Sequence, residues 1–200
     1  MKKISLWLTS IALLLMSASY AVAGPPTDFV KKKSERLFEV VNEPVGPART
    51  KALKKEVRAL VNYEELAKRA LGEHWTARTD AEKKEFIGLL ERLVELNYAN
   101  RFKTSSKERQ YTVKYLGEKV RESTGQSIVK TQVTYGEEVF TLDYKLLLRD
   151  GELTIYDAVF DDISLEETYR ESYVPIIKKE GWNSLLKRMK DKLKQLEGGG

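Results

Sequence analysis

The stretch Val139-Phe140-Thr141-Leu142-Asp143-Tyr144-Lys145-Leu146-Leu147-Leu148 has the clearest pattern in the chain. Successive side chains of a β-strand point to opposite faces. One face therefore carries Phe140, Leu142, Tyr144, Leu146 and Leu148, and the other carries Thr141, Asp143 and Lys145. This pattern predicts a sheet with one polar face and one concave, apolar, aromatic face. Such a face offers few groups for chemistry, so it favours a protein that holds an apolar molecule.

Three further segments resemble this one and predict an antiparallel sheet of about four strands. The expected strands are residues 110–118, 127–135, 138–148 and 153–161. The connections between the last three are short, and Asp150-Gly151 is a strong hairpin signal, so neighbouring strands should run antiparallel. The last strand is apolar on both sides, which is typical of a central or bulged strand. The expected apolar face includes Tyr111, Val113, Tyr115, Val129, Val133 and Tyr135.

Helical periodicity precedes and follows the strands. The expected helices are residues 29–41, 49–60, 63–71, 79–102, 165–177 and 182–196. Thr79 with Glu82, and Ser164 with Glu167, match the capping box that starts a helix. Pro175 should kink or restart its helix. Helices, then a meander of strands, then helices predict an α+β fold.

Residues 1–23 have the features of a secretory signal peptide. Lys2 and Lys3 precede an apolar run over residues 4–16, and Ala21-Val22-Ala23 is a small-x-small cleavage site. The run is shorter than the roughly 20 residues that cross a membrane. We therefore expect export and cleavage after Ala23, with an uncleaved anchor as the alternative. Residues 24–197 should form a single domain, and residues 198–200 a flexible glycine tail.

The composition excludes several kinds of chemistry. The chain has no cysteine and one histidine, so disulfides, thiol chemistry, cysteine-based zinc sites and multi-histidine metal sites are excluded. No phosphate-binding loop, dinucleotide fingerprint or hydrolase motif is present. We therefore expect no metal and no cofactor. A formal net charge of +5 is mildly basic, and export makes nucleic acid an improbable target.

Two carboxylates are the best candidates for catalysis. Asp143 or Asp157 in an apolar pocket could act as a general base. In the structural alternative, Asp143 faces solvent, and Asp157 caps a turn or pairs with Arg170 or a lysine. We favour the structural alternative, because no partner groups for an acid–base site are evident.

The aromatic face could be part of a packed core or the wall of a cavity. Tyrosine and phenylalanine at strand spacing usually belong to a packed core. The chain has ten tyrosines, which suit a wall that is apolar yet hydrogen-bonding at its rim. Curved sheets cupped by helices commonly enclose a ligand cavity. Together these features favour a cavity wall.

An ordered set of short segments resembles the MlaC family, also called the toluene-tolerance or Mla-pathway phospholipid-binding proteins. The similarity covers about residues 29–196, and the order of the segments carries it rather than any single motif. Two positions depart from the family pattern: Asp162 stands where glycine is usual, and Thr168 where asparagine is usual. The segments are Leu71-Gly72-x-x-Trp75, Glu85-Phe86, Tyr98, Leu142-Asp143-Tyr144, Tyr156-Asp157, Ile163-Ser164-Leu165 and Tyr169-Arg170.

The resemblance implies an NTF2-like cup whose apolar cavity takes the acyl chains of a glycerophospholipid. It implies a non-enzymatic periplasmic carrier, with phospholipid as cargo rather than cofactor. The implied partners are an outer-membrane lipoprotein/porin complex and an inner-membrane ABC transporter with an MCE-domain subunit, with transient contact to membrane surfaces. The implied role is to maintain outer-membrane lipid asymmetry.

Such cargo needs a dry enclosure. Exposing about thirty methylenes to water, at about 0.8 kcal/mol each, costs a free energy on the order of 20 kcal/mol. Two chains exceed the space inside a solid core. We therefore expect the sheet to stand apart from the helix over residues 86–98, and the helix that bears Tyr169 and Tyr173 to move on loading. The expected lipid-binding residues are Leu89, Leu93, Val113, Val133, Phe140, Leu142, Tyr144, Ile163, Leu165, Tyr169 and Tyr173.

Two other functions stay open at this point. The first is an exported NTF2-like enzyme that acts on an apolar small molecule, with Asp143 or Asp157 as base. The second is a non-lipid interaction module that uses basic helix faces, although such faces are more often simply solvated. The basic residues concerned are Lys51, Lys54, Lys55, Arg58, Lys187, Arg188, Lys190, Lys192 and Lys194.

Overall fold

The computed structural model describes residues 24–101 and 110–198, with the backbone alone for residues 98–101. The expected signal peptide and the last two glycines lie outside the described residues. Among the described helices, none has the length and apolar character needed to cross a bilayer.

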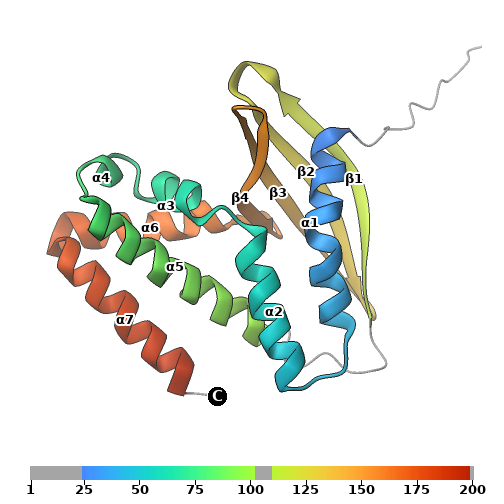
Figure 1. Ribbon diagram of the computed structural model, residues 1–200, viewed down its shortest axis with the longest axis horizontal. Helices are drawn as coiled ribbons and strands as arrows, with labels where there is room; N and C mark the ends of the chain where they lie inside the picture. Colours follow the sequence, from blue (N-terminus) through green and yellow to red (C-terminus); the bar gives the residue numbers. More distant parts are fainter. Residues whose placement is uncertain (1–23, 102–109, 199–200) are drawn as a thin grey trace, which may run out of the picture.

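Helices and strands are segregated, with a sheet on one side and most helices on the other (Figure 1). The helices are α1 (Pro25–Asn42), α2 (Pro47–Leu60), α3 (Tyr63–Leu71), α4 (Glu73–Thr76), α5 (Asp80–Arg101), α6 (Leu165–Glu180) and α7 (Trp182–Gly198). The strands are β1 (Tyr111–Arg121), β2 (Gln126–Tyr135), β3 (Glu138–Arg149), β4 (Glu152–Phe160) and β5 (Ile163–Ser164), with a 3-10 turn, η1 (Glu122–Thr124), after β1. The predicted α+β class is confirmed.

The five strands form one antiparallel sheet in the order β1-β2-β3-β4-β5. The register pairs Val133 with Phe140 and Leu142 with Phe160, so the predicted apolar face is continuous across the strands. Bulges in β1 and at Lys145/Leu146 interrupt the ladder and help the sheet to curve. Strand β5 was not predicted, because two residues are too few to show an alternating pattern.

Local capping explains where several helices begin. At the start of α5, the backbone N–H of Thr79 donates to Glu82 at 2.8 Å, and the N–H of Glu82 donates to the Thr79 hydroxyl at 3.3 Å. This is the complete capping box that the sequence predicts. Helix α1 begins earlier than expected, at Pro25, because proline is well tolerated in the first turn. Helix α6 continues through Pro175, so the restart considered there does not occur.

The buried side chains form two clusters. The larger one joins α5, α6 and α7 to α2, α3 and the second half of α1, and in it the ring centroid of Phe86 lies 5.8 Å from that of Tyr173 and 5.5 Å from that of Trp182. The smaller one lies between α1 and the sheet and contains Val30 and Tyr144. Helix α1 therefore covers part of the concave face, as Figure 1 shows.

The helical cluster should carry much of the stability. Phe86→Ala removes a fully buried ring, so we expect the free energy of unfolding to fall by about 3–5 kcal/mol in urea denaturation. As a matched control, Val139→Ala truncates a side chain that is 57% exposed and should change stability by less than about 0.5 kcal/mol. Similar stability of both variants would contradict a core centred on Phe86.

Candidate functional site

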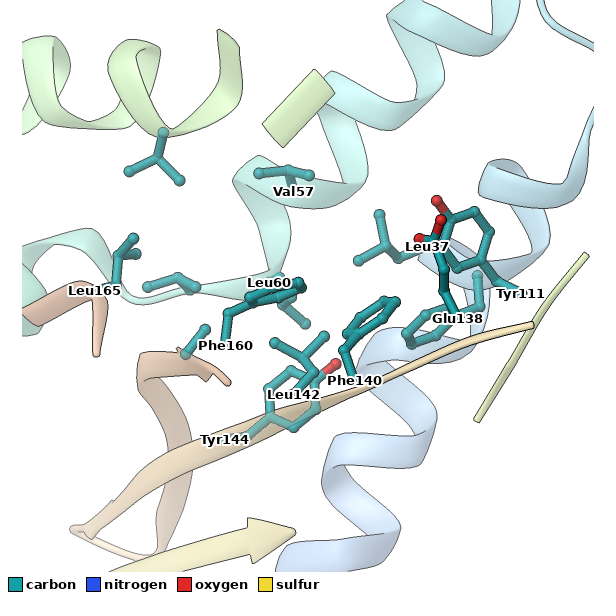
Figure 2. Close-up of a pocket in the computed structure, with 14 residues that line it drawn as sticks. Leu37, Val57, Leu60, Tyr111, Glu138, Phe140, Leu142, Tyr144, Phe160 and Leu165 are labelled. Carbon is teal, nitrogen blue, oxygen red and sulfur yellow. The ribbon is translucent and has the colours of Figure 1, made fainter. Parts of the chain in front are cut away.

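An apolar cavity of about 210 Å³ lies between the sheet and helices α1, α2 and α5 (Figure 2). Figure 2 shows Glu138 beside Tyr111 at one end of it and Leu165 at the other. The lining residues are Leu37, Phe38, Val57, Leu60, Val61, Val94, Tyr111, Glu138, Phe140, Leu142, Tyr144, Ala158, Phe160 and Leu165.

Strand alternation builds the floor of the cavity. Phe140, Leu142 and Tyr144 share the concave face of β3, and the register places Ala158 beside Tyr144 and Phe160 beside Leu142. The small side chain of Ala158 leaves space next to the large ring of Tyr144. The rings of Phe140 and Phe160 lie 4.8 Å apart and close one side. The floor is therefore apolar and mostly aromatic.

The cavity wall has little capacity for chemistry. Among the described residues that line it, Glu138 is the single charged one, and its side chain is exposed at the start of β3. Tyr144 is fully buried, and its hydroxyl lies near Ser34 without making a hydrogen bond to any described residue. Burial raises the pKa of Tyr144 far above its usual value, so this phenol stays neutral. The lining can therefore enclose an apolar group but carries no nucleophile with an adjacent base.

Four of the expected lipid-binding residues line the cavity: Phe140, Leu142, Tyr144 and Leu165. Val133 and Val113 lie on the same apolar face of the sheet but outside the lining. Leu89, Leu93 and Tyr173 lie in or against the helical cluster instead. Apolar residues at helical spacing are typical both of a packed core and of a cavity wall. The sequence alone therefore could not show which of the two environments these three residues occupy.

The remaining two, Ile163 and Tyr169, lie in a second hollow of about 470 Å³, which we call the outer groove. Leu165 and Phe160 line both the outer groove and the cavity. The outer groove is lined by Asn97, Phe160, Asp161, Ile163, Leu165, Thr168 and Tyr169.

Most of the cavity residues that were not predicted come from helices α1 and α2 and from β4. Leu37, Val57 and Leu60 were recognisable only as apolar helix positions. Phe160 was recognisable as part of a strand that is apolar on both sides. Nothing local distinguishes these residues from ordinary core.

A network around Asp157 fixes the start of α6. This carboxylate is fully buried and accepts hydrogen bonds from the Ser164 hydroxyl at 2.6 Å and from the backbone N–H of Glu166 at 2.9 Å. The ammonium group of Lys145 lies 2.9 Å away. Burial lowers the pKa of Lys145, but the hydrogen bond and charge of Asp157 outweigh that effect and raise it. Leu165 lies between two residues of this network, so the network positions a wall of the cavity.

Neither catalytic candidate lines the cavity. Asp143 points to the opposite face from Leu142 and Tyr144 and accepts the backbone N–H of Thr131 at 3.1 Å. Asp157 pairs with a lysine, as one structural alternative expected. Arg170, the other partner considered for Asp157, pairs with Glu166 instead. Within the described residues, no cluster of three or more His, Cys, Asp or Glu side chains could hold a metal ion.

Several of the basic residues on the helix faces are paired. Arg58 contacts Glu91 at 2.9 Å and Glu95 at 2.7 Å. On α7, Lys187 pairs with Asp191 at 2.9 Å. Exposed ion pairs of this kind reduce the net positive charge of these helix faces.

Breaking the Asp157 network should destabilise the protein. For Asp157→Asn, which leaves Lys145 without its buried partner, we expect a loss of about 3 kcal/mol in urea denaturation at pH 7. Because the pKa of Lys145 is raised in the folded state, this stabilisation is complete below about pH 10.4 and disappears as the pH rises further. Glu167→Gln is the control: its carboxylate is 3.7 Å from Lys145 but 62% exposed, so its loss should cost under about 1 kcal/mol. Equal effects of the two variants would contradict the assignment.

The buried hydroxyl of Tyr144 should lower the free energy of unfolding, because it gives up hydrogen bonds to water without gaining a partner among the described residues. Tyr144→Phe removes a buried, unpaired hydroxyl, so we expect a gain of about 1 kcal/mol at pH 7. The unfolded chain releases the tyrosine proton at about pH 10 and the folded chain does not, so the advantage of the variant should grow above that pH. In the control, Tyr115→Phe removes a hydroxyl that hydrogen-bonds Ser34 at 3.0 Å and should lower stability by about 1 kcal/mol. Destabilisation by Tyr144→Phe would show that its hydroxyl has a partner.

Comparison with known proteins supports the sequence resemblance. Among solved structures, the fold is similar to the phospholipid-binding protein from Ralstonia solanacearum in complex with a phospholipid, with a TM-score of 0.74 and 18% sequence identity. The match covers 85% of this chain and 97% of the other. At this identity the likeness establishes the fold alone. No curated protein matches the sequence.

The family comparison covers most of the described domain. The family model described as MlaC protein matches residues 31–191. These residues include every side chain that lines the cavity and the outer groove. The match extends over much more than half of the sequence, and the chain therefore belongs to the MlaC protein family.

Proposed function

We propose that this chain is a periplasmic carrier that binds a glycerophospholipid through its acyl chains. The apolar cavity between the sheet and helices α1, α2 and α5 carries the proposal. Membership of the MlaC family and the phospholipid named for the similar Ralstonia protein agree with it. Binding and transport require no covalent step, which suits a lining without catalytic groups.

The cavity wall matches the chemistry of an acyl chain. Burying each methylene stabilises a complex by about 0.8 kcal/mol, and no polar partner is needed for it. Leu142, Phe140 and Leu165 would contact the chain. Glu138 and Tyr111 lie at one end, where a polar group could meet them without entering the apolar region.

The cavity is too small for a whole lipid. If a methylene takes about the volume of a water molecule, about 30 Å³, then 210 Å³ holds roughly seven methylenes. Loading would therefore require the helices to move away from the sheet. Helix α6 is the candidate, because its first residue, Leu165, forms one wall of the cavity. The start of α6 is held by the Asp157 network, in addition to the packing of α6 in the helical cluster.

Membership of the MlaC family supports a proposed cellular role. We propose that the chain is exported by the signal peptide expected in residues 1–23 and cleaved after Ala23. It would then shuttle phospholipid between an outer-membrane lipoprotein/porin complex and an inner-membrane ABC transporter with an MCE-domain subunit. This exchange would maintain the lipid asymmetry of the outer membrane.

Lipid binding can be tested directly. Protein purified from a bacterial periplasm should carry about one phospholipid per chain, measured by native mass spectrometry. Leu142→Asp places a charge on the cavity floor and should abolish loading, because burying a charge in an apolar site is strongly unfavourable. Val139→Asp is the matched control. Val139 lies on the opposite face of β3 and is 57% exposed, so this variant should load lipid normally.

Circular dichroism should show that both variants are folded. A lipid-free wild-type protein that also fails to extract phospholipid from vesicles would overturn the proposed function.

A further inference from the structure

We propose that the Glu138 end of the cavity selects phospholipids whose headgroup carries an ammonium group, such as phosphatidylethanolamine, over anionic phospholipids. The site combines the Glu138 carboxylate with the stacked rings of Tyr111 and Tyr135. The inference rests on the proposed function, because it concerns the headgroup of the lipid whose acyl chain occupies the cavity. It also goes beyond that function, since an apolar cavity by itself does not distinguish one headgroup from another.

Strand register brings the three side chains of this site together. Tyr111 on β1 pairs with Tyr135 on β2, and Tyr135 pairs with Glu138 on β3. Directly paired residues lie on the same face of a sheet. Glu138 precedes Phe140 by two residues, so it shares the concave face with the cavity floor. The carboxylate therefore ends an otherwise apolar row and lies beside Tyr111, as Figure 2 shows.

The negative charge of Glu138 is not neutralised by its surroundings. Among the described residues, no cation forms an ion pair with this carboxylate. A nearby buried cation, Arg49, donates from its guanidinium to the backbone carbonyls of Val40 at 3.2 Å and Val41 at 2.7 Å. These carbonyls lie at the end of α1, where a cation is favourable. The carboxylate whose charge acts on Arg49 is Glu43, so Glu138 remains open to a cation of the ligand.

The tyrosine pair supplies the second part of an ammonium site. The ring centroids of Tyr111 and Tyr135 lie 4.2 Å apart, and the rings are inclined by 14°. Burial is the main cause of the raised pKa of Tyr111, and the charge of Glu138 raises it further. The phenol therefore stays neutral at pH 7, and its ring keeps the negative face that attracts a cation. An aromatic face beside a carboxylate is a favourable place for an ammonium group.

The Glu138 end is also the better end of the cavity for the polar part of a lipid. The opposite end is lined by the apolar side chain of Leu165, against which a phosphate or ammonium group would lose hydration without gaining a partner. Glu138 is exposed and borders the solvent. A headgroup that is anionic and lacks an ammonium group would be repelled by the charge of Glu138. The site therefore discriminates between headgroups by their charge.

The test is a competition between two lipids that differ only in the headgroup. Delipidated protein is mixed with equal amounts of phosphatidylethanolamine and phosphatidylglycerol that carry the same acyl chains, and the bound lipids are quantified by native mass spectrometry. Both lipids contain the phosphate, so the difference reports on the ammonium group. We expect the wild-type protein to prefer the ethanolamine lipid by about fivefold, the effect of one exposed ion pair with a cation–π contact.

Substitutions of Glu138 identify the responsible group. Glu138→Gln should lower the preference to below about twofold, and Glu138→Lys should reverse it in favour of the glycerol lipid. Glu137→Gln and Glu137→Lys are the matched controls, because Glu137 is adjacent and exposed but does not line the cavity. Both controls should keep the wild-type preference.

A further variant tests the ring. Tyr111→Leu keeps an apolar side chain in the lining and removes the aromatic face, so it should also lower the preference, and circular dichroism should show that the variant is folded. Equal binding of the two lipids by the wild-type protein would overturn the inference and leave the proposed function standing. A preference that survives the Glu138 or Tyr111 substitutions, or that the Glu137 variants also remove, would overturn the inference too. Wild-type protein that binds neither lipid would overturn the proposed function, and the headgroup site with it.

Discussion

The buried carboxylate of Asp157 is the constraint on which the functional part of the structure depends. Asp157 lies in β4, its cation Lys145 lies in β3, and its hydrogen-bond donors Ser164 and Glu166 flank the junction of β5 and α6. A charge removed from water is stable only when it is fully paired. The requirement therefore ties three strands and one helix together at a single point. Leu165, which lines both the cavity and the outer groove, lies inside that junction.

The cavity lies where the two clusters of buried side chains meet. Helices α5, α6 and α7 pack around Phe86, whereas α1 packs against the sheet around Tyr144. Leu37, Val57 and Val94 of the first cluster and Tyr144 of the second line the cavity without filling it. Helix α6 packs in the first cluster, and α1 contributes side chains to both clusters.

Much of the architecture was predictable from local patterns. The strands over residues 127–135 and 138–148, the helix over residues 63–71 and the capping box at Thr79 were all placed within a residue or two. The structural role of Asp157 beside a lysine was also foreseen. The residues that line the hollows were harder to predict, since Leu93 belongs to the helical cluster and Phe160, which was not expected, lines both hollows.

By itself, the sequence determined the α+β class, the apolar face of the sheet and most helix starts, because alternation, hairpins and caps depend on residues close together in the chain. Only the tertiary structure decided which apolar side chains face open space. Leu93 and Val94 are adjacent and both buried, yet only Val94 lines the cavity. An unfilled volume depends on the separation of elements that are distant in sequence, and that separation is set by long-range contacts that no local pattern records.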